Sequence, residues 1–249
     1  MQRNIFFITI IFIAFVFGGC TAKDDILIIN DAQSNPLVQD SPTPTPTPSP
    51  KPKIVLYSVP FASQAPLLNW DELHNEACEE ASMIMADTFF HKLSLDKNIM
   101  EEKIQKLVKW EEENGYTIDV TANEVAKILK DYFSLNASVK PINDALDIIS
   151  ELEHGYLVIV PAAGRLLKNP NYKTPGPLYH MLLVRGYVLN KQEIITNDPG
   201  TRKGEGYRYS YDVFFNAIHD WPKLGLGKDD VSDEEMNGSD KVMIVVSGI

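Results

Sequence analysis

The chain has only two cysteines among its 249 residues, Cys20 and Cys78. It has no Cys-x-x-Cys pair, no two histidines four residues apart and no glycine-rich phosphate loop, so the patterns of zinc and nucleotide sites are missing. We therefore expect no metal and no cofactor. Basic residues are also few, with 23 Lys and Arg against 34 Asp and Glu, for a net charge of −11. Because nucleic acid selects a basic surface, we expect no nucleic-acid partner.

An unbroken apolar run extends from Ile5 to Phe17. It is shorter than the roughly 20 residues that span a membrane. It follows Arg3 and ends at Gly18-Gly19-Cys20, which is typical of a secretory signal peptide. Small residues followed at once by cysteine resemble a bacterial lipoprotein signal, so we expect residues 1–19 to be removed and Cys20 to carry lipid. The alternative is a short uncleaved anchor, and in both cases the rest of the chain faces the extracellular or periplasmic side of the cell membrane.

Residues 20–53 are expected to be a disordered linker rich in proline and threonine. From Ser41 to Pro50 proline alternates with threonine or serine, a composition that favours an extended polyproline II conformation. Such a linker would hold the folded part away from a surface. Residues 54–249 have a globular composition and a length suited to one domain with its own core. We expect that domain to be a monomer.

Hydrophobic periodicity places helices in the first half of this domain and strands in the second. Helices are predicted over Cys78–His91, Met100–Glu113, Thr121–Phe133, Asn143–Glu153 and Tyr211–Ile218. Strands are predicted over Ile54–Val59, Tyr156–Val160, Met181–Val184, Glu193–Thr196 and Val242–Val246. The acidic residues 233–235 are expected in a solvated loop. The pattern predicts an α+β fold, with N-terminal helices packed on a C-terminal antiparallel sheet.

The candidate chemistry lies in Cys78, His180 and Asp198. Cys78 begins a predicted helix, where the backbone dipole favours the nucleophilic thiolate. His180 begins one predicted strand and Asp198 follows its hairpin partner, so the two should meet at the same end of the sheet. The order Cys, His, Asp is that of a thiol hydrolase. The alternative is that Cys78 is a buried core residue on an apolar stripe.

Five segments resemble stand-alone relatives of the bacteriocin-processing cysteine peptidases, peptidase family C39-like, in the papain-like clan. The segments are Val59–Gln64, Trp70, Glu76–Ser82, Tyr179–Tyr187 and Asn197–Thr201. The resemblance implies a papain-like fold with Cys78 as nucleophile, His180 as general base and Asp198 as the residue that orients it. It also implies that Gln64 donates to the oxyanion, which suits a neutral amide.

Two features differ from the family pattern. Family members usually carry Gly-Pro after the cysteine, whereas Glu79 and Glu80 follow Cys78 here. Carboxylates pointing inward would oppose ionisation of the thiol, but acidic residues are also common at helix N-termini for structural reasons, and we prefer that explanation. The chain also lacks the exporter to which the leader-cleaving relatives are fused, so their substrate is not implied.

The sequence thus predicts a lipid-anchored thiol peptidase that acts on a peptide or protein outside the cytoplasm. Two alternatives stay open, a catalytically silent peptide-binding module and a cell-wall peptide amidase or endopeptidase. The long loop from Gly164 to Pro177 precedes His180 and is a candidate substrate lid.

Overall fold

The computed structural model describes residues 26–29, 54–222 and 231–249. The predicted signal peptide, Cys20 and most of the predicted linker lie outside the described residues. Within the described ranges, no helix combines the length and the apolar character needed to cross a bilayer.

The core of the fold is an eight-stranded, mostly antiparallel sheet. Its strands are β1 (Ile26–Ile29), β2 (Ile54–Tyr57), β3 (Asn136–Pro141), β4 (Leu157–Ala163), β5 (Tyr179–Val188), β6 (Glu193–Asn197), β7 (Tyr207–Ser210) and β8 (Val242–Ser247). The main path runs β1-β2-β5-β4-β8-β3, and β6 pairs with both β5 and β7. β4 and β5 are buried at every position, which makes them the centre of the sheet.

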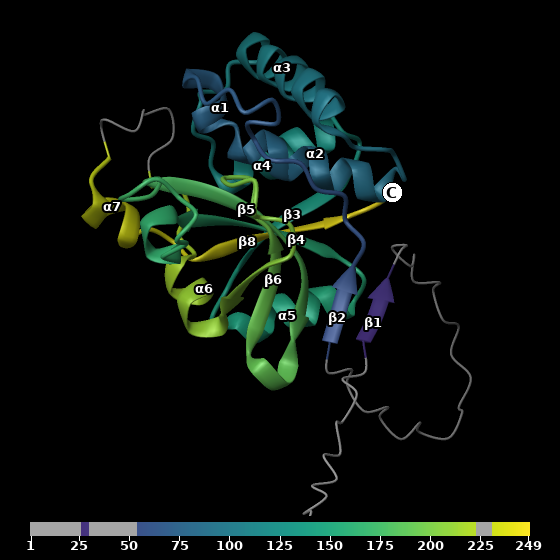
Figure 1. Cartoon of the computed structure of the whole chain (residues 1–249), viewed down its shortest axis with the longest axis vertical. Coiled ribbons are helices and arrows are strands. Elements are labelled where there is room, and N and C mark those ends of the chain that lie inside the picture. Colours follow the sequence, from purple (N-terminus) through teal and green to yellow (C-terminus); the bar gives the residue numbers. More distant parts are fainter. Residues whose placement is uncertain (1–25, 30–53, 223–230) are drawn as a thin grey trace, which may run out of the picture.

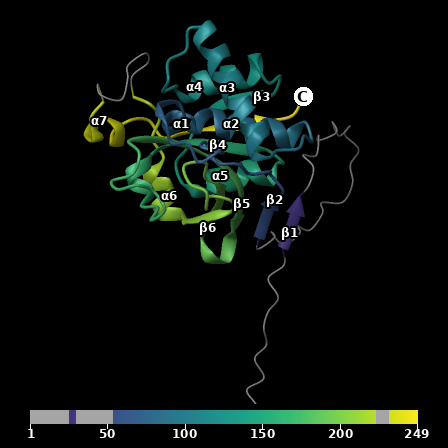
Figure 2. The same ribbon diagram turned by 45° about the horizontal axis from the view of Figure 1, so that its top comes forward.

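Helices cover both faces of this sheet. They are α1 (Glu72–Glu76), α2 (Cys78–Phe90), α3 (Lys97–Glu113), α4 (Ala122–Asp131), α5 (Ala145–Glu153), α6 (Tyr211–Ala217) and α7 (Asp233–Asn237), with 3-10 turns at Gly164–Leu167 and Leu189–Lys191. Figures 1 and 2 show α1 to α4 on one side of the sheet and α5 and α6 on the other. α2 lies between β5 and α3 and contacts both, so it is buried along nearly its whole length.

The predicted α+β fold is confirmed, and most predicted elements are present within a few residues of their expected bounds. Helix α4 begins with the capping box of Thr121 and Glu124, in which each side chain bonds the other's backbone. Two strands are clearly longer than predicted, because β5 extends over Tyr179–Val188 instead of Met181–Val184, and β4 continues through Pro161 to Ala163 instead of ending at the proline. Pro161 lacks a backbone donor, but it pairs with Met181 of β5 and its carbonyl accepts a bond from the His219 amide.

Several elements were not predicted. The acidic residues 233–235, expected in a loop, form α7, which Ser232 and Glu235 cap. Strands β3 and β7 were missed because neither has a clear apolar alternation. Strand β1 lies inside the segment expected to be a disordered linker, and it pairs in parallel with β2 from Ile26↔Ile54 to Ile29↔Tyr57.

Candidate active site

His180 and Asp198 meet at one end of the central hairpin. His180 lies near the start of β5, and Asp198 directly follows β6, which pairs with β5 from Leu183↔Asn197 onward. The register brings the two side chains together, and His180 Nε2 lies 2.9 Å from Asp198 Oδ1. Both side chains are almost completely buried, at 2% and 0% relative exposure. The predicted contact between these two residues is present.

The Asp198 carboxylate accepts hydrogen bonds on both oxygens. Besides His180, the Gly200 backbone N–H donates to Oδ1 at 3.0 Å. Oδ2 accepts from Asn169 at 2.9 Å and from the hydroxyls of Tyr172 and Tyr209 at 2.6 Å each. Burial raises the pKa of Asp198, but the charge of His180 and these hydrogen bonds outweigh it and hold the pKa below its usual value. The carboxylate therefore stays ionised next to the imidazole.

Asn169, Tyr172 and Tyr209 were missed by the sequence analysis. The first two lie in the loop between residues 164 and 177, which was expected to be a lid. In the structure that loop lies against Asp198 through Asn169 and Tyr172, and the Tyr172 ring stands edge-on to the His180 ring, with centroids 5.4 Å apart. Tyr209 comes from β7, a strand that was not predicted. The only signal in the sequence is that the loop precedes His180, and this does not indicate which of its side chains turn inward.

Gly200 leaves room for the imidazole. A Cβ at this position would lie 2.8 Å from His180 Cε1 and 3.1 Å from Nε2. Any other residue would push against the ring or move the loop that follows Asp198. The Asp-Pro-Gly segment thus fixes the imidazole from two directions, by the carboxylate and by close backbone contact.

Cys78 is the first residue of α2 and is 5% exposed. α2 packs against β5, where the Ser82 hydroxyl donates to the Met181 carbonyl at 3.3 Å. The Met181 backbone also hydrogen-bonds the Cys78 sulfur and favours the thiolate. Cys78 therefore lies beside the residue that follows His180. Its thiol donates to Glu79 Oε2 at 2.8 Å.

The preferred explanation of Glu79 and Glu80 was wrong. Both residues point inward, with relative exposures of 0% and 4%, instead of lying on a solvated helix end. Burial, first of all, raises the pKa of the Cys78 thiol well above its usual value, and the negative charges of Glu79 and Glu80 raise this pKa further. The dipole of α2 was expected to favour the thiolate, but burial and the two carboxyl groups raise the pKa overall, so the resting thiol is neutral.

Gln64 lies between the two halves of the site. Its backbone N–H donates to the carbonyl of Pro199, the residue after Asp198, at 3.0 Å. Its side-chain amide donates to the carbonyls of His74 at 2.9 Å and Asn75 at 3.0 Å, just before Cys78. Both amide hydrogens are thus engaged with the backbone. One of these bonds would have to be exchanged for Gln64 to donate to an oxyanion.

Two more buried carboxyl groups lie near Glu80, beyond the pair next to the thiol. Glu111 of α3 and Asp119 are 5% exposed each, and they lie close enough to Glu80 for its charge to affect both. Burial, and next the charge of Glu80, raise the pKa of Glu111 to about 11 and that of Asp119 to about 7. Within the described part of the chain, no group of three or more Asp, Glu, His or Cys residues has the arrangement of a metal site.

This geometry was compared with known proteins. The model of the Peptidase C39-like family matches residues 57–227, which include all of the site described above. The chain belongs to the Peptidase C39-like family. No curated protein matches the chain. Among solved structures, a candidate C39-like peptidase from Bacillus anthracis aligns with a TM-score of 0.47 and 13% identity, over 77% of this chain and 96% of that one.

Membership of this family gives the general activity. The family is one of peptidases, so a peptidase that hydrolyses peptide bonds is the function the comparison supports. The match begins at Tyr57, the last residue of β2, and ends at residue 227, so it spans the segments that carry Gln64, Cys78, His180 and Asp198.

Proposed function

We propose that the protein is a cysteine peptidase in which Cys78, His180 and Asp198 act as a catalytic triad. One observation carries this proposal, the buried 2.9 Å contact between His180 Nε2 and Asp198 Oδ1. It lies next to Met181, whose backbone hydrogen-bonds the Cys78 sulfur. A carboxylate that holds an imidazole in a fixed orientation, next to a thiol, is the arrangement that thiol hydrolysis requires.

Each residue has a distinct role in the proposed reaction. Because Asp198 occupies Nε2 of His180, Nδ1 is the nitrogen that takes the thiol proton as the sulfur attacks the scissile carbonyl carbon. The same proton then passes to the leaving amine when the C–N bond breaks. Water next attacks the acyl carbon and gives a proton to His180, the C–S bond breaks to release the carboxylic acid product, and His180 returns the proton to the sulfur. Asp198 holds the ring and stabilises the imidazolium.

The neutral resting thiol gives this reaction a particular starting point. The sulfur cannot attack until its hydrogen bond to Glu79 is exchanged for one to His180. Substrate bound in the site excludes the water that would otherwise solvate the negative thiolate and the positive imidazolium. Gln64 takes part as the proposed oxyanion donor by exchanging its bond to the Asn75 carbonyl, the longer of its two at 3.0 Å. The backbone N–H of Cys78 at the start of α2 is the second donor in this proposal.

The proposed enzyme acts outside the cytoplasm, attached by lipid at Cys20. Support for this comes from the sequence alone, from the apolar run that ends at Gly18-Gly19-Cys20. Metabolic labelling with a radioactive fatty acid should mark the wild-type protein, and Cys20→Ser should remove the label and leave an uncleaved precursor. A mature wild-type chain without lipid would refute the anchor without affecting the triad.

Peptide cleavage by matched variants tests the triad. An internally quenched peptide library should be cleaved by the wild-type protein and not by Cys78→Ala or His180→Ala, whose losses should be equal because both residues act in one step. His154→Ala is the matched control, because His154 is exposed at the end of α5 and should keep full activity. Folding is checked by circular dichroism. A folded His180→Ala protein with wild-type turnover would refute the proposal.

A peptide-binding module without catalysis is the second candidate. One observation favours it, the raised pKa of a thiol that donates to a carboxyl group instead of to an imidazole. In that case the library would bind to the wild-type protein and to Cys78→Ala with the same affinity, and neither protein would cleave it.

A further inference from the structure

A cavity of about 370 Å³ lies beside the Cys78 end of α2. Its walls come from α1, the start of α2, the last two turns of α3 and the chain that follows α3. Ala77, which immediately precedes Cys78, is one of its lining residues. A group held in this cavity is therefore close to the sulfur. The cavity has no role in the proposed triad, which lies on the β5 side of Cys78.

The deep part of the cavity is acidic. Glu80 and Glu111 line it and are only 4% and 5% exposed. Oε2 of Glu80 and Oε1 of Glu111 have no hydrogen-bond partner among the described residues. Glu80 and Glu111 lie close enough to hydrogen-bond each other, and the pKa of Glu111 is raised to about 11, so on its own the pair shares one proton and carries one negative charge. A ligand that donates to both carboxyl groups can replace that proton and satisfy their oxygens.

The rest of the lining has the same sign of charge. Six of its residues are acidic, and none of the described lining residues is a lysine, arginine or histidine. His74, which follows the lining residue Leu73 in α1, is already paired with Asp71 at 2.7 Å and Glu101 at 3.0 Å. The charge of the cavity therefore selects a cation.

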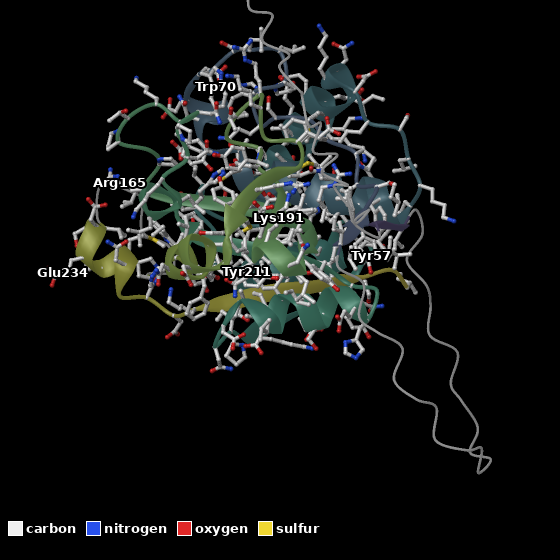
Figure 3. The ribbon with its side chains drawn as sticks, turned by 60° about the horizontal axis from the view of Figure 1, so that its bottom comes forward. Tyr57, Trp70, Arg165, Lys191, Tyr211 and Glu234 are labelled. Atoms are coloured by element: carbon white, nitrogen blue, oxygen red, sulfur yellow. The ribbon has the colours of Figure 1, made fainter. Side chains whose placement is uncertain are left out.

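The walls above these acids are partly apolar. Leu73, Val108, Tyr116 and Ile118 line the cavity, and Ile118 is 61% exposed at its edge. Trp70, just before α1, is also exposed. A second cavity, lined by Lys191 and Tyr211, lies well apart from Trp70 (Figure 3). Apolar walls over an acidic floor suit an aliphatic chain that ends in a positive charge. A bare metal ion would need converging oxygens and no apolar wall, and the described residues include no metal-binding group.

We propose that this cavity is a specificity pocket that holds the lysine or arginine side chain of a peptide substrate, next to the bond that is cleaved. The proposal names the substrate class of the peptidase proposed above and rests on it. The apolar walls contact the aliphatic part of the side chain, and the ammonium or guanidinium group donates to Glu80 and Glu111 in place of the proton that these two carboxyl groups share. A guanidinium can reach both carboxyl groups at once because its donors form a planar fork.

Binding of a small probe tests the pocket without any need for catalysis. The probes are Nα-acetyl-arginine methylamide and its citrulline counterpart, which has nearly the same shape and no charge. In ligand-observed NMR titrations of the full-length protein, we expect the arginine probe to bind at least about ten-fold more tightly. Glu111→Gln should remove this preference. Glu113→Gln, the same substitution two residues along α3 at an exposed position outside the cavity, should keep it.

Cleavage of peptides separates this proposal from the proposed function. In pairs of quenched peptides that differ only in arginine or citrulline, kcat/KM should be on the order of 10² higher for arginine, and Glu111→Gln should lower it only for the arginine peptide. Cys78-dependent cleavage that is indifferent to charge would overturn the pocket and leave the peptidase intact. Charge-selective probe binding without Cys78-dependent cleavage would keep the pocket and overturn the peptidase. Equal binding of the two probes, or a preference that survives Glu111→Gln, also overturns the pocket.

Discussion

Replacement of Glu79 by glutamine tests the cause of the neutral thiol. Glu79 Oε2 accepts a hydrogen bond from the Cys78 thiol at 2.8 Å, and its carboxyl group is fully buried. Glutamine has nearly the same shape and keeps an acceptor, but it cannot carry a negative charge. The change therefore removes the repulsion between a carboxylate and a thiolate and leaves the burial of the sulfur as it is.

The size of the effect follows from Coulomb's law. Two unit charges about 4 Å apart interact by about 4 kcal/mol at an effective dielectric constant of about 20, which corresponds to about three pKa units. The pKa of Glu79 is itself raised well above its usual value, by burial first and then by Glu80, so its carboxyl group carries the charge only in part. We expect Glu79→Gln to lower the pKa of Cys78 by about one to three units. Glu80→Gln should lower it less, because Glu80 is the weaker of the two charges acting on the sulfur.

Alkylation of Cys78 by iodoacetamide between pH 5 and pH 11, followed by mass spectrometry of the Cys78 peptide, measures this pKa. The midpoint should move to lower pH in Glu79→Gln. The rate at neutral pH should rise roughly 3- to 50-fold, since a lower pKa gives more thiolate but makes each thiolate less nucleophilic. Glu113→Gln is the control for net charge and should match the wild-type profile. A midpoint that stays in place or moves to higher pH in Glu79→Gln would contradict the role assigned to this carboxyl group.

Three further substitutions test the support of the imidazole. Asp198→Asn should lower kcat by less than His180→Ala, since it misorients the ring without removing it, as matched kinetics would show. Tyr172→Phe should cost about 1.5–3 kcal/mol of unfolding free energy in urea, because a hydrogen bond to a charged group is lost. The same variant should move the acid limb of the pH–rate profile to higher pH, because one of the bonds that hold down the pKa of Asp198 is gone. Gly200→Ala should reduce activity while the fold persists, and Gly248→Ala, whose new Cβ would meet Phe90 only at 3.5 Å, should have no effect on either.

The contact between His180 and Asp198 could be predicted because it depends on local pairing. Two apolar runs joined by a short turn form a hairpin, and residues at its open ends must lie side by side. The start of α2 at Cys78 could be predicted for a similar reason, since acidic residues in a first turn and apolar residues after it indicate a helix N-terminus. Both inferences needed only residues close together in the chain.

The inward position of Glu79 and Glu80 could not be predicted in this way. A helix pattern separates a buried face from a solvated one, but α2 is enclosed by β5 on one side and α3 on another, and its residues from Cys78 to Phe89 are all buried. The buried position of Glu111 could not be predicted either, because this residue is next to exposed acidic residues of α3 in the sequence and yet faces α2. These positions depend on packing between elements that are far apart in the chain.

Strand β1 changes how far the enzyme can be from the membrane. If Cys20 is the lipidated residue, as proposed, only five residues, 21–25, separate it from β1, which is paired with β2 at the edge of the sheet. Even a fully extended chain of that length reaches no more than about 20 Å. The Pro/Thr segment of residues 41–50 lies between β1 and β2 in sequence, and the two strands are already side by side, so its length adds nothing to the tether. With β1 paired, the β1 edge of the sheet would stay within this reach of the lipid surface, and detachment of this one strand would release more than twenty additional residues of reach.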